Sequence, residues 1–305
     1  MHWPGVKNML IKNPLKRKLV QLAAFGFTNS RLANFFGGKL YTGAWKNFCT
    51  PGLNCYSCPA ASFACPIGAL QAVSSSQKFN FSFYVVGFLL AVGVLLGRFV
   101  CGWLCPFGLV QELIHKIPAP KFKLWRGLKY VKYMVLVVFV IALPVAVTDY
   151  VGLGKPAFCQ YICPSGTLLG GLPMLAAHPE LRSALGWLFS LKTAVLVVTI
   201  VGCVLVYRFF CKVLCPLGAI YGLLNKLSVY HLEVDGERCV RCGACARACK
   251  MEVDPVKSPG SAECIRCGEC AAACPKGAIR LGFRAAKPEN ASGVEETFGF
   301  EQKAE

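Results

Sequence analysis

Histidine is scarce in this chain, and the motifs of several cofactor classes are missing. The four histidines, His2, His115, His178 and His231, are unpaired, so the sequence does not support a haem held by two histidines. No Cys-x-x-Cys-His occurs, and covalent haem is therefore not supported either. No nucleotide-binding or nucleophile motif is apparent. These absences leave the cysteines as the residues that can carry chemistry.

Acidic residues are also few. The chain has 15 Asp and Glu against 33 Lys and Arg, which gives a formal net charge of +18. In a soluble chain this excess would suit nucleic-acid binding. Here 55% of the residues are hydrophobic and they form long uncharged blocks, so we interpret the basic residues as cytoplasmic loops beside membrane spans. We expect contact with membrane lipid and no nucleic-acid partner.

Four segments are apolar enough to be membrane spans, which need about 20 residues each. The strongest is Phe79 to Gly97, which carries no charge. The second half of the chain contributes a segment with only one charge, Lys192. Buried core helices are the alternative, but four such segments favour spans. The predicted spans are residues 19–37, 79–97, 133–148 (with a kink at Pro144) and 185–207.

The distribution of Lys and Arg predicts the orientation of these spans. Residues 1–18 are basic, and so is the connection between the second and third spans. The connections at 38–78 and 149–184 are poorer in Lys and Arg. We therefore predict a multi-pass protein of the inner (cytoplasmic) membrane whose N- and C-termini are both cytoplasmic.

Two turns of nearly the same sequence follow the second and fourth predicted spans. Residues 98–108 read RFVCGWLCPFG and residues 208–218 read RFFCKVLCPLG. Over 98–117 and 208–227, 9 of 20 positions are identical, which indicates an internal duplication. Two copies supply the four cysteines that a 4Fe–4S cluster needs, although these cysteines could also only pack helices. We predict one inner-face cluster held by Cys101, Cys105, Cys211 and Cys215.

A proline follows the second cysteine of each inner turn. Because proline is favoured at the first position of a helix, Pro106 and Pro216 predict short helices over LVQELIHKI and AIYGLLNKL. Cys105 and Cys215 would then lie at helix N-termini, where the dipole and free N–H groups favour an anionic thiolate cluster. The glycine two positions after each proline would let the backbone come close.

Six further cysteines lie in the two predicted outer connections, at 49–65 and 159–163. The motif Cys-Pro-x-Gly-x-Leu occurs at Cys65 and again at Cys163, so the duplicated unit extends from an outer Cys-Pro turn through a span to an inner turn. Cys55 competes with Cys58 as the fourth ligand, and Cys49 with the cysteine left over could form a disulfide or have no role. We predict an outer-face cluster held by Cys58, Cys65, Cys159 and Cys163.

The strongest motif lies after the last span. Two runs of C-x2-C-x2-C-x3-C follow one another, and in bacterial ferredoxins the fourth cysteine of each run binds the other cluster. A zinc site is the alternative, but eight cysteines at this repeated spacing argue against it. We assign one 4Fe–4S cluster to Cys239, Cys242, Cys245 and Cys274, and a second to Cys264, Cys267, Cys270 and Cys249.

These motifs define the domains and the fold class. We expect a mainly α protein: a four-span transmembrane helical domain at 19–228, built from an internal duplication, and a small α+β two-cluster ferredoxin domain at 229–284. Residues 285–305 are polar and acidic and are predicted to be disordered. The expected cofactors are two 4Fe–4S clusters in the ferredoxin domain and one or two more in the membrane domain.

Three residues outside the cysteine motifs have alternative interpretations. Glu112 and His115 could accept protons from a quinol, although an amphipathic interfacial helix explains them more simply. Cys203 lies alone inside the fourth span, where it is more simply a small core residue than a ligand.

Four spans, the Cys-x-x-x-Cys-Pro turns at 101–106 and 211–216, and a C-terminal two-cluster ferredoxin resemble the membrane ferredoxins of the periplasmic nitrate reductase (NapH-like) type. The nitrous-oxide-reduction regulator and the cytochrome-oxidase assembly ferredoxin share these elements. The resemblance covers about residues 15–284, and the outer motif at Cys55, Cys58 and Cys65 goes beyond its simplest pattern. It implies electron transfer between membrane quinol and a partner redox protein.

The leading hypothesis is therefore an integral membrane electron-transfer protein. Electrons would pass between the quinone pool, or another membrane or periplasmic redox protein, and the ferredoxin clusters, which would serve a cytoplasmic electron-transfer partner. The chain would then be a quinol-oxidising component of a larger oxidoreductase. The rival hypothesis is an assembly or regulatory protein whose clusters supply electrons for the maturation of a metal centre.

Overall fold

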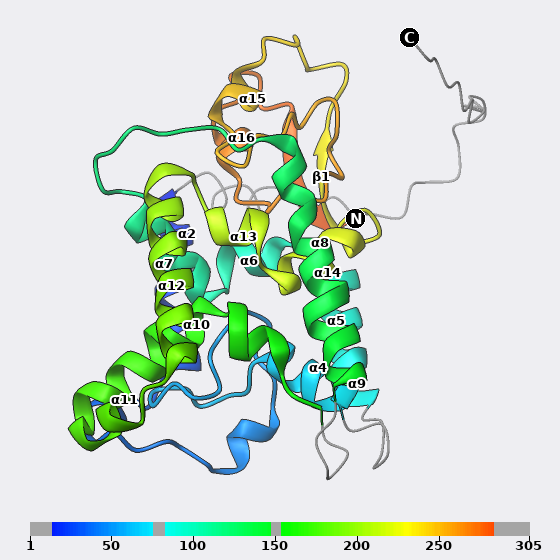
Figure 1. The fold of residues 1–305 in the computed structure, drawn as a ribbon. Helices are drawn as coiled ribbons and strands as arrows, with labels where there is room; N and C mark the ends of the chain where they lie inside the picture. Colours follow the sequence, from blue (N-terminus) through cyan, green and yellow to red (C-terminus); the bar gives the residue numbers. More distant parts are fainter. Residues whose placement is uncertain (1–13, 76–82, 148–153, 284–305) are drawn as a thin grey trace, which may run out of the picture.

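The protein is mainly helical and carries a small sheet near its C-terminal end. A computed structural model describes residues 14–75, 83–147 and 154–283 (Figure 1). The expected helical majority and α+β end are confirmed. The predicted disordered tail and most of the basic N-terminus lie outside the described residues. So does the beginning of the second predicted span.

The helices of the first half follow the apolar runs and the Cys-Pro turns. They are α2 (Pro14–Thr28), α3 (Asn34–Gly37), a 3-10 turn (Ala44–Asn47), α4 (Pro66–Ser75), α5 (Phe83–Leu96), α6 (Phe99–Trp103) and α7 (Pro106–Ile114). A 3-10 turn (Arg126–Tyr130), α8 (Val131–Val135), a π-helical segment (Leu136–Ala142) and α9 (Leu143–Ala146) then form one continuous helical stretch.

The second half again passes from a helix after an outer Cys-Pro turn, through a long helix, to two short helices. It contains a π-helical turn (Phe158–Ile162), α10 (Pro164–Gly166), a second π-helical turn (Thr167–Gly171), α11 (Leu172–Ala177), a 3-10 turn (Pro179–Ala184), α12 (Trp187–Leu205), α13 (Phe209–Val213) and α14 (Pro216–Leu224). The C-terminal module contains β1 (Tyr230–Val234), α15 (Ala244–Ala248), α16 (Glu269–Ala272) and β2 (Ile279–Phe283).

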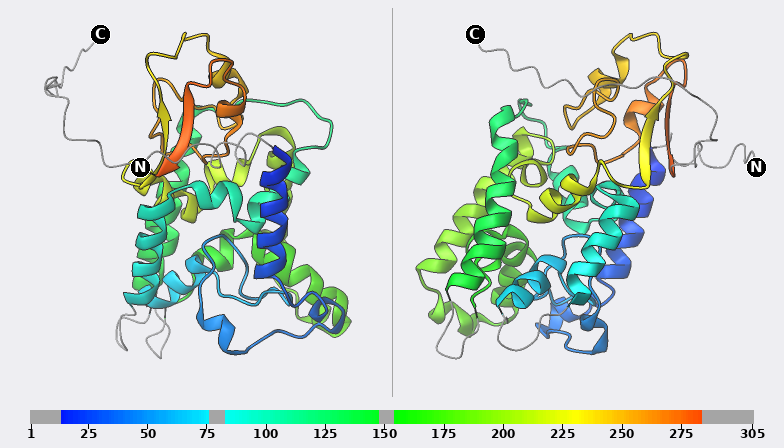
Figure 2. Two further views of the ribbon diagram at one scale, coloured as in Figure 1. Left: turned by 180° about the vertical axis from the view of Figure 1, so that it is seen from behind. Right: turned by 90° about the vertical axis from the view of Figure 1, so that its right-hand side faces the viewer.

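Helices α2, α5 and α12 and the stretch from α8 to α9 run along the direction from the C-terminal module toward the opposite end of the molecule (Figures 1 and 2). Two of them, Arg126–Ala146 with 21 residues and Trp187–Leu205 with 19, are long and apolar enough to cross a membrane. Phe83–Leu96 is a shorter apolar helix.

The first predicted span is shorter than expected and begins earlier. Helix α2 has 15 residues and ends at Thr28. At this end the backbone N–H and the side chain of Asn29 both donate to the Phe25 carbonyl, at 2.9 and 3.1 Å. The Pro144 kink takes the form of the π-helical segment that precedes α9, since proline lacks the N–H of a regular turn.

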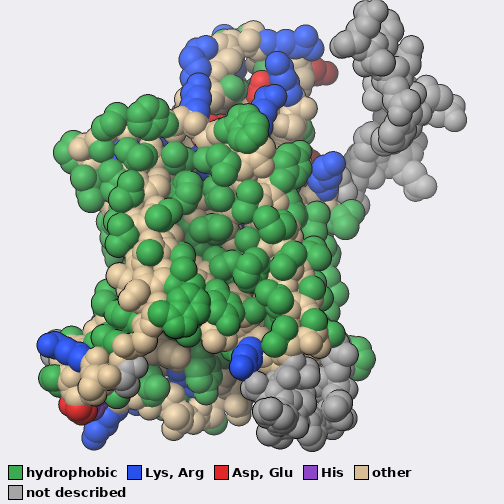
Figure 3. Space-filling view, in the orientation of Figure 1, with side chains coloured by type: hydrophobic (Ala, Val, Ile, Leu, Met, Phe, Trp, Pro, Cys, Tyr) green, Lys and Arg blue, Asp and Glu red, His purple; other side chains and the backbone are tan. Residues whose placement is uncertain are grey.

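Large apolar side chains are exposed along the middle of the molecule (Figure 3). They lie on all four stretches and include Leu22 on α2, Leu95 on α5, Val137 in the π-helical segment and Val198 on α12. Their exposed fractions run from 53% to 61%. An exposed apolar surface of this extent is typical of a surface that contacts another protein or a membrane.

The C-terminal module lies at one end, at the top of Figure 1. Strands β1 and β2 pair antiparallel, with Tyr230 opposite Phe283 and Val234 opposite Ile279. Leu232, Ile279 and Leu281 pack with Cys245 and Cys270 in its small core. The module is held together by few apolar side chains, and cysteines form part of that core.

Candidate metal centres

The two inner turns fold as the Cys-Pro motif predicts. Pro106 begins α7 and Pro216 begins α14, and the preceding cysteine has an extended backbone at the N-cap position. The Gly218 N–H donates to Cys215 Sγ at 3.4 Å. A side chain at Gly108 would come within 3.1 Å of the Cys101 carbonyl oxygen, so the close approach expected there is present.

The two turns are joined by a reciprocal exchange of arginines. Arg208 of the second turn donates to the Cys101 carbonyl at 2.5 Å. Arg98 of the first turn donates to the Cys211 carbonyl at 3.3 Å. Both arginines are fully buried. Each repeat therefore fixes the cysteine backbone of the other repeat, which explains why the motif begins with arginine.

The inner group of cysteines is brought together at the centre of the molecule. The Cys215 thiol lies within electrostatic range of Cys211, Cys101 and Cys105, and all four side chains are buried. Burial raises the pKa of the Cys105 thiol to about 12. Such a thiol stays neutral unless a metal centre displaces its proton. Four buried thiols from two proline-started helices fit a 4Fe–4S cluster.

The outer group contains Cys55 rather than Cys58. The Cys163 thiol lies within electrostatic range of Cys159, Cys55 and Cys65. These four cysteines line a cavity of about 770 Å³ together with Lys46 and Lys192. The structure thus brings together Cys65, Cys159 and Cys163 as predicted, and adds the competing choice for the fourth position.

Three cysteines lie outside the groups of four. Cys58 packs with Ala60 and Ala61, and its sulfur lies 3.9 Å from Asn29 Oδ1. Cys203 is buried within α12 and faces Gln111, as expected of a small core residue. Within the part of the chain that the structure describes, Cys49 is not joined to another cysteine by a disulfide.

The cysteines of the C-terminal module form two groups that cross over between the runs. Cys239, Cys242, Cys245 and Cys274 line one small cavity. The Cys270 thiol lies within electrostatic range of Cys267, Cys264 and Cys249. The fourth cysteine of each run therefore lies with the first three of the other run, which is the arrangement of two-cluster ferredoxins.

No group of three or more His, Cys, Asp and Glu side chains in the described residues has the geometry to hold a metal ion. A site for a single metal ion needs side chains that converge on one point. The four thiolates of a 4Fe–4S cluster each bind a different iron and stand further apart.

The second cysteine loop of the module rests directly on the inner turn. A side chain at Gly102 would come within 2.3 Å of the Ile265 carbonyl oxygen. Trp103 Nε1 donates to the Arg266 carbonyl at 3.1 Å. Arg98, which holds the Cys211 carbonyl, also pairs with Glu263 at 2.9 Å, next to Cys264. The inner group and the second module group are thus neighbours.

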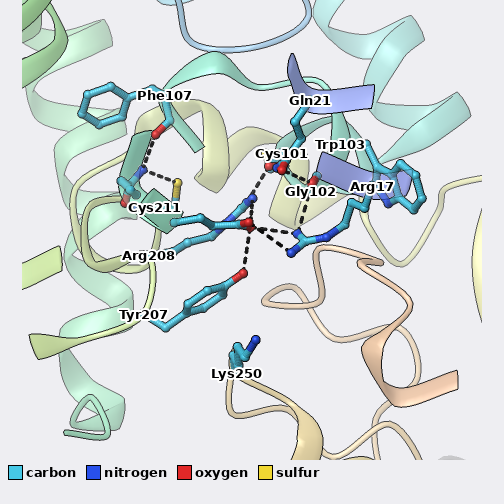
Figure 4. A network of polar contacts seen from close by, with 12 residues as sticks. Arg17, Gln21, Cys101, Gly102, Trp103, Phe107, Tyr207, Arg208, Cys211 and Lys250 are labelled. Carbon is cyan, nitrogen blue, oxygen red and sulfur yellow. Dashed lines mark hydrogen bonds and ion pairs between the residues drawn. The ribbon is translucent and has the colours of Figure 1, made fainter. Parts of the chain in front are cut away.

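Glu112 is the centre of a buried ionic network, and Figure 4 shows its partners Arg17, Tyr207 and Arg208 pointing toward one another. Its carboxylate accepts from Arg17 at 2.8 Å, from Arg208 at 2.6 Å and from the Tyr207 hydroxyl at 2.8 Å. Burial opposes the charged form, but Arg208 and Arg17 outweigh it and lower the pKa of Glu112 to about 2. A carboxylate held this way is a poor proton acceptor, so the simpler structural role is favoured. His115 contacts the Cys203 carbonyl through Nδ1 at 2.9 Å.

Two glutamines that contact the cysteine groups were not predicted from the sequence. Gln111 Nε2 donates to Cys211 Sγ at 3.0 Å, and Gln71 Nε2 donates to Cys159 Sγ at 3.2 Å. Each also accepts a backbone N–H of the same opposite turn, from Cys211 and Phe158 respectively. Aligning CPIGALQ with CPFGLVQ would have shown that both glutamines follow the cysteine at the same offset.

The fold and these cysteine groups define a helical iron–sulfur protein with a ferredoxin-type end. A family described as "4Fe-4S binding domain" matches residues 62–83, 81–124, 133–175 and 185–234, together just over half of the chain. The chain belongs to this family. A second family with the same description matches residues 261–280.

Several curated proteins are similar to the chain. An uncharacterized protein of Methanocaldococcus jannaschii is 28% identical over 54% of this chain and 56% of its own length. The putative electron transport protein YccM of Escherichia coli is 28% identical over 54% and 44%. The methylamine utilization ferredoxin-type protein MauN of Methylorubrum extorquens is 29% identical over 54% and 50%.

The matched part spans about half the length of these relatives. No solved structure matches the chain. The family matches identify an iron–sulfur protein.

Proposed function

We propose that this chain is an integral membrane electron-transfer protein that conducts electrons through a row of 4Fe–4S clusters. The observation that carries the proposal is the grouping of the cysteines. All except Cys49, Cys58 and Cys203 fall into four groups of four. The groups follow one another from the outer end, through the inner turns, to the C-terminal module. When bound, each cluster would carry one electron at a time.

The chain's own residues would hold this row in register. The outer group lies at the end of the molecule opposite the module (Figure 1). Arg98 and Arg208 fix the inner turns to each other, and the contact of Gly102 with Ile265 places the second module group next. We propose that electrons pass between the quinone pool, or an outer-face redox protein, and the module.

The apolar surface supports a membrane position with four spans. Exposed apolar side chains cover α2, α5, α8 to α9 and α12. Aromatic residues mark the ends of this belt, with Trp125 and Tyr130 near the module and Trp187 and Trp45 near the outer cysteines, as at membrane interfaces. We infer that the module and both termini are cytoplasmic in the inner membrane.

The outer group makes a prediction that separates two neighbouring cysteines. Cys55 lines the outer cavity, whereas Cys58 lies in an apolar cluster beside it. We expect Cys55→Ser to remove about four irons per chain, one cluster's content, and Cys58→Ser to leave the iron content unchanged. Iron and sulfide analysis of the two anaerobically purified variants checks this. The reverse pattern would restore Cys58 as the ligand.

Gln111 and Gln71 predict a change in potential without loss of iron. An amide N–H donated to a cluster sulfur stabilises the reduced form and raises the reduction potential. We expect Gln111→Leu to lower the potential of one cluster and Gln71→Leu to lower that of another. Redox titration followed by EPR measures this, with Gln160→Leu as the control next to Cys159. An unchanged potential in both variants would show that the glutamines act only in packing.

Transfer from quinol is tested in vesicles. The anaerobically purified protein is incorporated into liposomes with a reduced quinone, and the clusters are followed by EPR. The proposal expects reduction of the module clusters and steady quinol oxidation when an acceptor is present. Absence of reduction by quinol and by an outer-face reductant would contradict it. Reduction that stops after one turnover would favour the maturation role instead.

A further inference from the structure

The two cysteine loops of the module have the same backbone but different surroundings. The first loop is Cys239-Val240-Arg241-Cys242 and the second is Cys264-Ile265-Arg266-Cys267. The arginines have φ of 50° and 52°, and each loop is followed by a glycine, with φ of 71° and 86°. Positive φ is uncommon at arginine, so the loops share an unusual shape.

The second loop is a docking element within the chain. Ile265 is 1% exposed and lies against Gly102 of the inner turn. Arg266 is also buried, and it donates to the Leu96 carbonyl at 2.9 Å and to the Asn225 carbonyl at 2.7 Å. An apolar side chain and an arginine thus connect the second cluster group to the membrane part.

In the first loop the corresponding apolar residue and arginine are exposed to solvent. Val240 is 60% exposed, and Arg241 is exposed as well. Cys242 beside them is the one exposed cysteine in the described part of the chain. This loop lies with its cluster group at the end of the row.

Three of the module's carboxylates pair with cations of the membrane part, whereas Asp235 and Asp254 lie beside the first cysteine group. Glu252 pairs with Lys212 at 2.8 Å, Glu263 pairs with Arg98, and Glu269 pairs with Arg17 at 3.5 Å. All three cations belong to the membrane part. Around the first cysteine group lie Arg238, Arg241 and Lys276. Of these, only Arg238 has a carboxylate partner among the described residues, namely Asp235.

We propose that the Val240–Arg241 loop and Lys276 form the docking surface for a small acidic electron-carrier protein. The proposal rests on the function proposed above. The partner would offer a shallow apolar recess for Val240, with carboxylates around it for Arg241 and Lys276. One electron would leave this protein and reduce the carrier by one electron, and no bond would form or break. Opposite charges raise association rates and make them sensitive to salt.

The test uses the reduced holoprotein in stopped-flow oxidation by a purified acidic two-cluster ferredoxin and, separately, by a small uncharged dye. We expect the ferredoxin rate to fall at least tenfold between low and high salt, and to fall similarly at low salt in Arg241→Glu with Lys276→Glu. Val240→Ser should also slow the ferredoxin, without changing the salt dependence. The dye rate should stay the same throughout.

The matched control is the double variant Lys39→Glu with Arg182→Glu. It changes the net charge by the same amount as Arg241→Glu with Lys276→Glu, and both of its residues are exposed at the end of the molecule opposite the module. It should leave the ferredoxin rate unchanged. An unchanged ferredoxin rate in Arg241→Glu with Lys276→Glu, or an equal loss in the control, would overturn the docking surface. A wild-type protein with full iron content that reduces neither acceptor would overturn the proposed function itself.

Discussion

Replacing Cys101 and Cys211 together by serine is expected to abolish electron transfer between the outer group and the C-terminal module. The two cysteines come from opposite repeats, and each contributes to the inner group at the centre of the row. Loss of two of four thiols leaves too few ligands for a 4Fe–4S cluster. Because tunnelling falls steeply with distance, the gap that remains is too long to be crossed at a useful rate.

The measurement is reduction of the module clusters by quinol or by an outer-face reductant. In the double variant their EPR signals should still appear with dithionite, which reaches the module directly, but not with the outer reductant. Cys203→Ser is the matched control, since Cys203 is buried close to Cys211 but lies outside the groups of four. Normal reduction from the outer side in the double variant would exclude the inner turns from the path.

Glu112→Leu is expected to destabilise the protein by about 3–5 kcal/mol, the usual cost of removing one partner from a buried ion pair. It would leave the buried Arg208 guanidinium without its carboxylate, and Arg17 with only Glu269 at 3.5 Å. Arg208 also holds the Cys101 carbonyl, so the inner turns should loosen with it. We expect faster loss of iron on warming and a lower unfolding temperature.

The same ionic network predicts that the stability of the folded protein depends on pH. The pKa of Glu112 is lowered to about 2 in the folded protein from the ordinary value of 4.5. Its contribution to stability is therefore complete above pH 4.5 and is lost as the pH falls toward 2. Glu180→Leu is the control, because that side chain is 73% exposed. Equal unfolding temperatures for the two variants would show that the ionic network contributes little.

The cysteine spacing predicted the C-terminal module closely, because C-x2-C-x2-C-x3-C fixes ligands over a short stretch of chain. The Cys-Pro turns also predicted the starts of α7 and α14, since proline suits a helix start through its own covalent geometry. The duplication also predicted that cysteines of the two copies lie together, as Cys101 and Cys211 do. In these cases local chemistry decided the structure.

Other features depended on long-range packing that a pattern does not encode. The sequence favoured Cys58 over Cys55 as the fourth outer ligand, whereas the fold of the outer connection places Cys55 in the cavity and Cys58 in an apolar cluster. In the sequence Arg17 is one of several basic residues before a predicted span, but in the structure it is buried against Glu112. Two of the four predicted spans reach the length and hydropathy of a membrane helix in the described residues.

The most direct test of this account is the iron content of the anaerobically purified chain, measured together with acid-labile sulfide and Mössbauer spectra. Four groups of four cysteines predict about sixteen irons and as many sulfides per chain, all in 4Fe–4S clusters. A content of about eight irons, confined to the C-terminal module, would contradict a row of clusters through the membrane part.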